Sequence, residues 1–286
     1  MSRTLRFAIG SVVVAALVLA LKLGAWALTG SVALLADALE SVVNVAAAIA
    51  ALVAVHYAAM PADANHPYGH GRIEPLVTFL VVGFLITSAT IIGYESIENI
   101  GTPHALPKAW TLAVLAGIIV WKEISFRTVM KKAVETNSSS LKADAWHHRS
   151  DAVTSIAAFI GISIALLLGK GYEAADDWAA LFAAGFILYN SYLIFRPALG
   201  EILDEHVYDD LVAEIRAVAQ RVPGVLGTEK CFIRKAGMQY HVDLHANVSG
   251  DISVRAGHEI AHQLQDTLHE KLPQLGNILI HVEPQD

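Results

Sequence analysis

Charge and cysteine are both scarce in this chain of 286 residues. Only 16% of the residues are charged and 55% are hydrophobic, whereas an ordinary soluble domain carries roughly 25% charged residues. Cys231 is the single cysteine, which excludes an internal disulfide and a metal cluster held by several thiolates. The net charge of -7 and the lack of a basic stripe argue against a nucleic-acid partner.

Signatures of familiar enzymes and pumps are missing as well. The sequence has no Gly-x4-Gly-Lys-Ser/Thr loop to cradle a nucleotide phosphate, so ATP-driven pumping is not expected. The apolar runs carry no His-Glu-x-x-His sequence, which disfavours an intramembrane metallohydrolase. Thirteen histidines beside one cysteine direct any metal chemistry toward nitrogen and oxygen ligands. We therefore expect a protein that is not an enzyme.

Long apolar runs dominate the first two thirds of the chain. They predict six helices, each near or above the ~20 residues needed to cross a bilayer, and glycine or proline turns separate them. The expected spans are about 7–28, 32–57, 75–100, 109–130, 144–169 and 176–199. Lysine and arginine gather at the N-terminus, in the second and fourth loops and after the sixth span, which places both termini in the cytoplasm. We expect residues 1–204 to form a multi-pass domain in a bacterial inner membrane.

Two of these apolar runs repeat one polar pattern. Ala-Asp-Ala is followed by one residue, a metal-capable side chain, three residues and a second metal-capable side chain. The pattern occupies residues 36–44 and 143–151, and its metal-capable positions are Glu40, Asn44, His147 and Asp151. Positions four apart share a helix face, so two such helices facing each other would offer four ligands to one cation. Ionisable groups in apolar helices are costly and by default mark an ion pathway.

An interhelical hydrogen-bond cluster is the alternative interpretation of these four residues, and the duplicated spacing does not favour it.

Four oxygen and nitrogen ligands suit tetrahedral zinc, and also ferrous iron, cobalt or manganese. Glu40 and Asp151 would neutralise a dication. Asp37 and Asp144 lie one turn earlier, and we expect them to support the ligands, carry protons or cap helix ends rather than bind the metal.

Residues 205–286 have the composition of a soluble domain. Helical spacing from Tyr208 to Arg221 and from Val254 to Leu272 alternates with strand-like segments at 230–234, 239–248 and 277–282. The predicted order is helix, strand, strand, helix, strand. Such a sandwich covers one face of its sheet with helices and leaves the other face free, often for dimerisation.

Further metal-capable residues lie outside the apolar runs. Asp63, His66 and His70 fall within one eight-residue loop that Pro67 and Gly69 bend, although a solvated loop with incidental histidines is the alternative. Seven of the 13 histidines follow residue 205. Alternation along a strand puts three tail residues on one face, and these are His241, Asp243 and His245.

Three segments together resemble the cation diffusion facilitator family of divalent-metal exporters, from about residue 7 to the C-terminus. They are Thr29 to Ala38, Pro61 to Glu74 and Asp144 to Asp151. The resemblance implies a homodimer with six helices per protomer and a ferredoxin-like, heavy-metal-chaperone-like αββαβ domain in the cytoplasm. Glu40 and Asn44 depart from the family, whose bacterial members commonly have two aspartates, or histidine and aspartate, there. This departure concerns the choice of metal and not the architecture.

The resemblance also assigns ligands. Asp63, His66 and His70 match a second metal site of the family one for one. The implied tail ligands are His245, His258, His281 and Glu283, with Glu229 as an additional candidate. His262 and His269 are expected to be exposed helix residues, and His241 fits either role.

We therefore expect a secondary active transporter in the lipid bilayer that exports a divalent metal from the cytoplasm in exchange for protons. Zinc or ferrous iron is the first choice, and cobalt, cadmium and manganese are compatible. His147 is the natural coupling group, because an imidazole titrates near neutral pH and lets proton and metal compete. The tail would sense metal by closing two protomers together. The alternative is a membrane-bound sensor or scaffold that binds metal without translocating it, although such a protein would not need a buried site.

Overall fold

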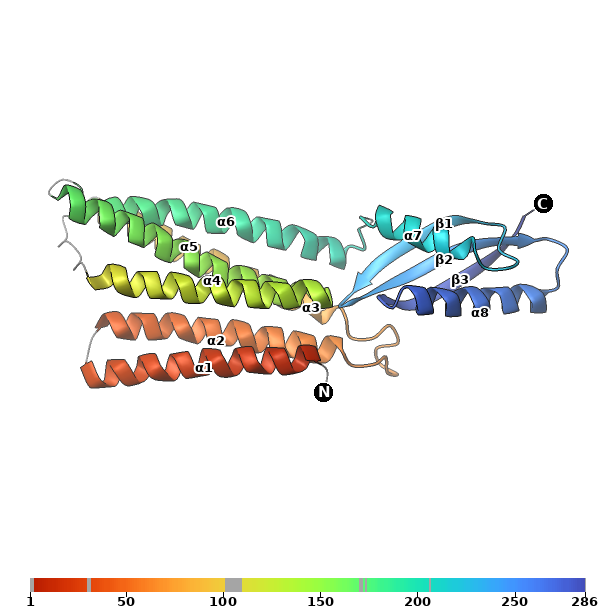
Figure 1. The fold of residues 1–286 in the computed structure, drawn as a ribbon, viewed down its shortest axis with the longest axis horizontal. Helices are drawn as coiled ribbons and strands as arrows, with labels where there is room; N and C mark the ends of the chain where they lie inside the picture. Colours follow the sequence, from red (N-terminus) through yellow and green to blue (C-terminus); the bar gives the residue numbers. More distant parts are fainter. Residues whose placement is uncertain are drawn as a thin grey trace. The chain divides into compact units, whose positions relative to one another are not determined.

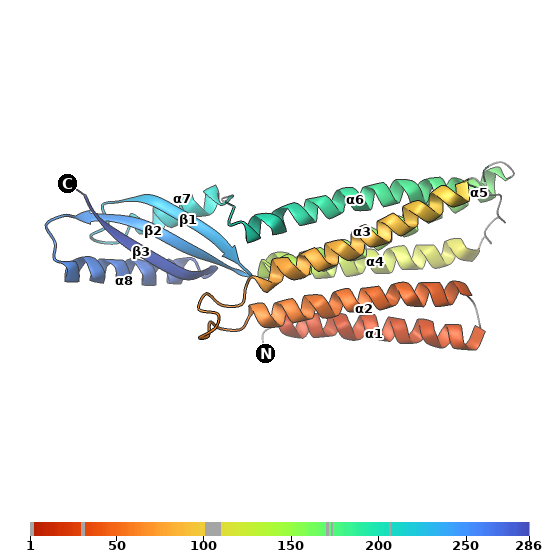
Figure 2. The same cartoon turned by 180° about the vertical axis from the view of Figure 1, so that it is seen from behind.

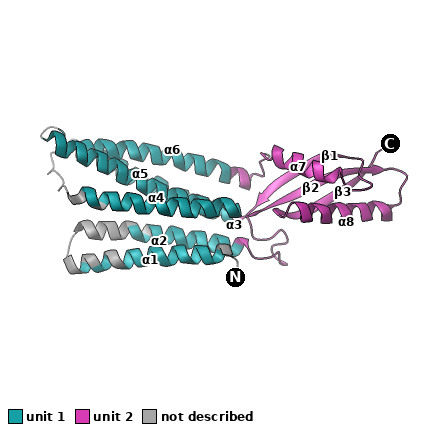
Figure 3. Ribbon diagram, in the orientation of Figure 1, with its two compact units in different colours: residues 1–57, 73–198 teal, residues 58–72, 199–286 magenta. Residues whose placement is uncertain are grey.

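The computed structural model describes residues 3–29, 32–100, 110–169, 172, 174–205 and 207–285 (Figure 1). The side chains of Asp37 and Glu40 lie outside the described part of the chain. The chain divides into two units, residues 1–57 with 73–198 and residues 58–72 with 199–286 (Figure 3). Because the second unit includes the loop 58–72, that loop groups with the tail and not with the helices that flank it.

Six long helices make up the described part of the first unit, in agreement with the six segments predicted from the apolar runs. They are α1 (Arg3–Thr29), α2 (Val32–Ala58), α3 (Ile73–Ile100), α4 (Trp110–Thr136), α5 (Ser139–Leu168) and α6 (Ala175–Ile202). Among the described residues, three helices are long and apolar enough to cross a membrane, namely Ile73–Ile100, Ser139–Leu168 and Asp177–Ile202. Large side chains such as Leu167 and Phe182 are 84% and 77% exposed, which suits contact with lipid and not with water.

Small and branched residues pack the helices of this unit together. One buried cluster joins α2, α3, α5 and α6 through residues such as Ala54, Leu85, Ala143 and Ile187. A second cluster joins α2, α4 and α5 and includes Leu141. α5 also packs directly against both α3 and α4. The helix that carries the second copy of the polar repeat therefore lies inside the bundle.

A buried carboxylate fixes the beginning of α5. Glu74, at the start of α3, is fully buried and accepts hydrogen bonds from the hydroxyls of Ser138 at 2.8 Å and Ser140 at 3.1 Å. It also accepts the backbone N–H of Ser140 at 3.2 Å, while the Ser138 hydroxyl caps α5 by accepting from Leu141 N. A carboxylate is stabilised at a helix N-terminus by the unpaired N–H groups there. The position of α5 is thus set by α3.

The tail has the predicted order of helices and strands. Its elements are α7 (Asp209–Ala219), β1 (Gly227–Ala236), β2 (Gln239–Ser249), α8 (Val254–Lys271) and β3 (Leu275–Gln285). The sheet order is β1-β2-β3, with β1 and β2 antiparallel and β2 and β3 parallel. Figures 1 and 2 show α7 and α8 together on one face of the sheet. Ile215, Val242, Leu244 and Leu264 belong to the core between the two layers, so the αββαβ fold class is confirmed.

The loop 58–72 is fastened to the tail by backbone contact. A Cβ on Gly71 would clash with the backbone of Ala236, and Gly237 turns the β1–β2 hairpin with a φ of +66°. Next along the chain, the guanidinium of Arg72 donates to the backbone carbonyls of Glu201 and Ile202 and forms an ion pair with Asp204. These contacts join the loop to the hairpin and to residues 201–204 within one unit.

Candidate metal sites

The two copies of the polar repeat meet at Asn44 and His147. Asn44 lies on α2 and His147 on α5, and Asn44 Oδ1 is 2.5 Å from His147 Nε2. His147 is 4% exposed, and its Nδ1 has no hydrogen-bond partner in the described part of the chain. The structure therefore brings two of the four predicted membrane ligands into contact. Glu40 lies one turn before Asn44 on the same helix, but its side chain is outside the described residues.

Asp151, the fourth predicted ligand, has a partner that the sequence reasoning missed. Lys122 on α4 places its Nζ 2.5 Å from Asp151 Oδ2, and the two side chains are only 14% and 13% exposed. The signal was present in the sequence, because Lys122 interrupts an apolar run and an ionisable residue inside such a run marks a functional site by default. α4 has no copy of the repeat, so the repeat does not indicate Lys122.

Two more polar residues beside this site are buried. Asp144, one turn before His147 on α5, is 1% exposed, and neither of its carboxylate oxygens has a hydrogen-bond partner among the described residues. His148 Nδ1 is likewise buried, with no hydrogen-bond partner among the described residues. Burying a polar group without a partner is costly, so these atoms are suited to an ion, a proton or water that completes the site.

A cavity of about 760 Å³ opens beside these residues, between α1, α2, α4 and α5. Its wall is mostly apolar, and the polar side chains that line it include Ser41, Asn44, Lys122 and His148. A mostly apolar cavity with a few convergent polar groups is the usual form of a small-ligand site. Asn44 is the predicted ligand that the cavity lining includes, and Lys122 and His148 share the same wall.

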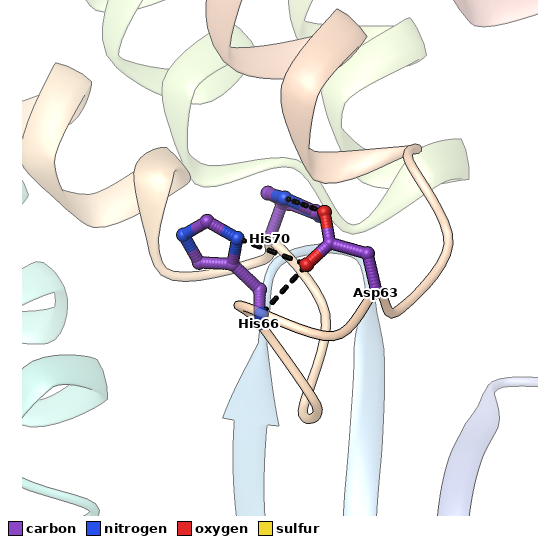
Figure 4. A group of neighbouring side chains, drawn as sticks. All are labelled: Asp63, His66 and His70. Carbon is purple, nitrogen blue, oxygen red and sulfur yellow. Dashed lines mark hydrogen bonds and ion pairs between the residues drawn. The ribbon is translucent and has the colours of Figure 1, made fainter.

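The loop residues Asp63, His66 and His70 form a second group (Figure 4). Asp63 Oδ1 is 3.3 Å from His66 Nδ1, Asp63 Oδ2 is 3.4 Å from His70 Nε2, and the three ligand atoms lie within 4.8 Å of one another. The backbone N–H of His66 donates to Asp63 and is the main reason that the pKa of Asp63 is lowered. A carboxylate held in its charged form next to two imidazoles is ready to bind a dication.

The third group lies on the uncovered face of the tail sheet. His245 on β2 and His281 on β3 are paired in register, and both approach Glu283 Oε1, at 2.7 and 3.8 Å. The hydrogen bond from His245 is the main cause of the lowered pKa of Glu283, and Glu229 lies near enough to affect this carboxylate as well. Four of the five tail residues that the resemblance implied are therefore together.

His258 is the implied tail ligand that the structure places elsewhere. It lies on the exposed side of α8, and its Nε2 is 3.1 Å from that of His262. These residues begin and end a His258-Glu259-Ile260-Ala261-His262 sequence, a His-Glu-x-x-His spacing that the sequence reasoning overlooked in the tail. In the part of the chain that the structure describes, no third ligand atom lies within 4.8 Å of both histidines. The arrangement is therefore a surface pair and not a catalytic zinc site, which needs three protein ligands.

Family models match both units. The cation efflux transmembrane domain matches residues 8–203, and the cytoplasmic domain of cation efflux proteins matches residues 207–285. The chain belongs to the cation diffusion facilitator family. This confirms the resemblance drawn from the three sequence segments, and it means that the protein is a membrane protein of a family that exports metal cations.

Relatives in this family align with nearly the whole chain. The cation-efflux pump FieF of Pectobacterium carotovorum is 30% identical over 284 residues, which cover 97% of this chain and 91% of FieF. The manganese efflux system protein MneP of Bacillus subtilis is 28% identical over 258 residues, which cover 89% of this chain and 87% of MneP. Among solved structures, a nickel form of a MamM CTD variant is 23% identical and covers 27% of this chain and 99% of that chain, with a TM-score of 0.27.

Proposed function

We propose that this member of the cation diffusion facilitator family exports a divalent transition metal from the cytoplasm in exchange for protons, with Glu40, Asn44, His147 and Asp151 as the transport ligands. The observation that carries the proposal is the contact between Asn44 and His147 beside a cavity between α1, α2, α4 and α5. Asp151 extends the same face of α5 by one turn. A buried site of this kind suits a carrier better than a sensor or scaffold, which would bind metal at an accessible surface.

Zinc or ferrous iron is the proposed substrate. One imidazole, two carboxylates and one amide oxygen form a set that borderline cations accept, whereas thiolates, which would select softer ions, do not contribute to it. Cobalt, cadmium and manganese are compatible with the same ligands. Manganese belongs in any substrate panel because a relative, MneP, is named for manganese efflux.

Protons are the proposed counter-substrate, and His147 is the group that couples them. An imidazole must give up a proton to coordinate a metal, so metal binding and proton binding at one nitrogen exclude each other. Proton entry from the outer side would then promote metal release. Both termini and the tail would lie on the cytoplasmic side of a bacterial inner membrane.

The loop and tail groups are proposed as additional metal sites. Asp63, His66 and His70 would bind a metal in the loop 58–72. Glu229, His245, His281 and Glu283 would bind one on the uncovered face of the tail sheet. Since that face also suits a second protomer, metal there would stabilise a homodimer and favour one conformation of the carrier.

Metal uptake into proteoliposomes with an imposed pH gradient tests the proposal. Zinc, ferrous iron, manganese, cobalt and cadmium are offered in parallel, and internal acidification or alkalinisation is followed in the same vesicles. We expect uptake of at least zinc or iron, with proton movement in the opposite direction. Binding of metal by the detergent-solubilised protein without any flux would instead identify a sensor or scaffold.

A further inference from the structure

Lys122 is a cation that the chain itself places at the proposed transport site. It lies on α4, directly after the apolar sequence Ile118-Ile119-Val120-Trp121. Its Nζ is 2.5 Å from Asp151 Oδ2, and both side chains are more than four-fifths buried. A lysine inside an apolar helix is expensive and is retained for a partner or a pathway. Here the partner is a proposed metal ligand.

The ion pair and a bound metal compete for the same carboxylate. A metal coordinated by Asp151 would lie roughly 2.0–2.2 Å from a carboxylate oxygen, close to an ammonium that already neutralises the group. Two like charges at such a separation repel strongly in a medium of low dielectric constant. Lys122 also lies within electrostatic range of Asp144, His147 and His148, so its charge acts on the whole group.

The cavity beside Lys122 can accommodate its ammonium group after displacement. Lys122 lines the cavity together with Asn44 and His148, and its four-carbon side chain is flexible enough to move the ammonium along the wall. The ammonium would then exchange its carboxylate partner for polar groups and water in the cavity. Displacement of the lysine would therefore require rotation of its side chain along the cavity wall and a change of its polar partners.

We infer that Lys122 is a tethered counter-cation, which neutralises Asp151 in the metal-free protein and is displaced into the cavity when a dication binds. The inference rests on the proposed function, because it takes Asp151 as a metal ligand. The lysine keeps the empty site from exposing a bare carboxylate inside the membrane domain. It also weakens metal binding, since each metal must displace it, and so favours release.

Lys122→Met tests this by removing the charge while keeping most of the side-chain length, and Lys122→Arg keeps the charge. Zinc binding is measured by titration of the full-length protein in detergent, and zinc uptake is measured in proteoliposomes. The binding step that Asp151→Asn removes reports the membrane site. We expect Lys122→Met to tighten that step and lower the apparent KM by at least about tenfold, with a lower maximal rate because release slows. Lys122→Arg keeps the charge, so its zinc affinity should lie closer to that of the wild type than the affinity of Lys122→Met does. The control Lys142→Met, at an exposed residue, should behave like the wild type.

An unchanged zinc affinity in a folded Lys122→Met protein would overturn the inference. Equal destabilisation of the metal-free and metal-bound forms by Lys122→Met would also overturn it, because a lysine with a purely structural role would stabilise both forms alike. If Asp151→Asn removes no binding step and leaves flux intact, the proposed function itself fails, which is a separate result.

Labelling of the wild-type protein keeps the test independent of any variant's folding. A small amine-reactive reagent is applied with and without zinc, and modification of Lys122 is quantified by mass spectrometry. Displacement predicts more labelling of Lys122 with zinc present and no change at Lys142. Zinc-independent labelling of Lys122 would contradict displacement.

Discussion

The proposed membrane site and the proposed tail site offer the same kinds of side chain in opposite surroundings. In the tail, His245, His281 and Glu283 line an uncovered sheet face, and the side chain of His281 is 61% exposed. In the helical unit, His147 is 4% exposed and Asp151 is held by Lys122. Water can solvate side chains on an open face, whereas buried polar groups in the bundle depend on partners within the protein. Lys122, as the proposed counter-cation, supplies such a partner to Asp151, and side chains on the open face of the tail do not need one.

The largest effect should follow from removing the membrane carboxylate. We expect Asp151→Ala to abolish metal flux, by more than the roughly 10–100-fold that loss of a supporting residue costs, while metal binding at the tail persists. Vesicle uptake and metal titration of the same preparation measure both. Asp144→Asn is the matched comparison on the same helix, and normal flux in a folded Asp151→Ala protein would refute the assignment of the membrane site.

Damage to the tail site should have a smaller effect on transport. Replacing His245 and His281 together by alanine removes the two imidazoles described beside Glu283, so metal binding at the tail should weaken by at least about tenfold. Flux should fall by about fivefold and not vanish, since the tail acts only through coupling to the carrier. Metal titration and vesicle uptake of the full-length protein measure both effects. His269→Ala, an exposed change on α8, is the control, and tail binding that survives the double replacement would exclude this face as the site.

A third change alters the charge of the membrane site without removing a ligand. Asn44→Asp replaces the amide oxygen near His147 by a carboxylate, and the added negative charge should tighten metal binding by roughly tenfold. Ions held mostly by charge gain most, so the accepted set should broaden toward cadmium or manganese. Competition among metals for uptake would show the change, and Asn44→Gln keeps a neutral amide as the control. An unaltered affinity order would mean that Asn44 does not touch the metal.

The smallest effect concerns acid stability of the tail. Burial lowers the pKa of His241 below its ordinary value, and Arg234 and Arg72 lower it further. The unfolded state therefore binds more protons, so the tail loses stability as pH falls from the ordinary imidazole pKa toward the lowered one. His241→Gln should reduce this acid sensitivity, as measured by thermal unfolding at several pH values. The exposed His269→Gln should leave it unchanged, and an identical pH dependence in His241→Gln would exclude His241 as its source.

Much of this architecture could be predicted because it depends on local patterns. Apolar length located the helices, and alternation placed His245 on the free face of β2, because side chains of a strand alternate between faces. The spacing of the repeat put His147 and Asp151 on one face of α5 for a similar reason. Lys122 escaped prediction because α4 has no copy of the repeat and its distance in sequence from Asp151 gives no hint of contact.

By itself the sequence determined which residues share a helix face or a strand face, and which kinds of ligand the protein offers. These properties follow from the fixed periods of helix and strand. Only the tertiary structure decided that Lys122 reaches Asp151, that Glu74 fixes the start of α5, and that His258 lies with His262 and not with His245. Such partnerships depend on how separate elements pack, which is set by buried contacts across the whole unit and not by any local pattern.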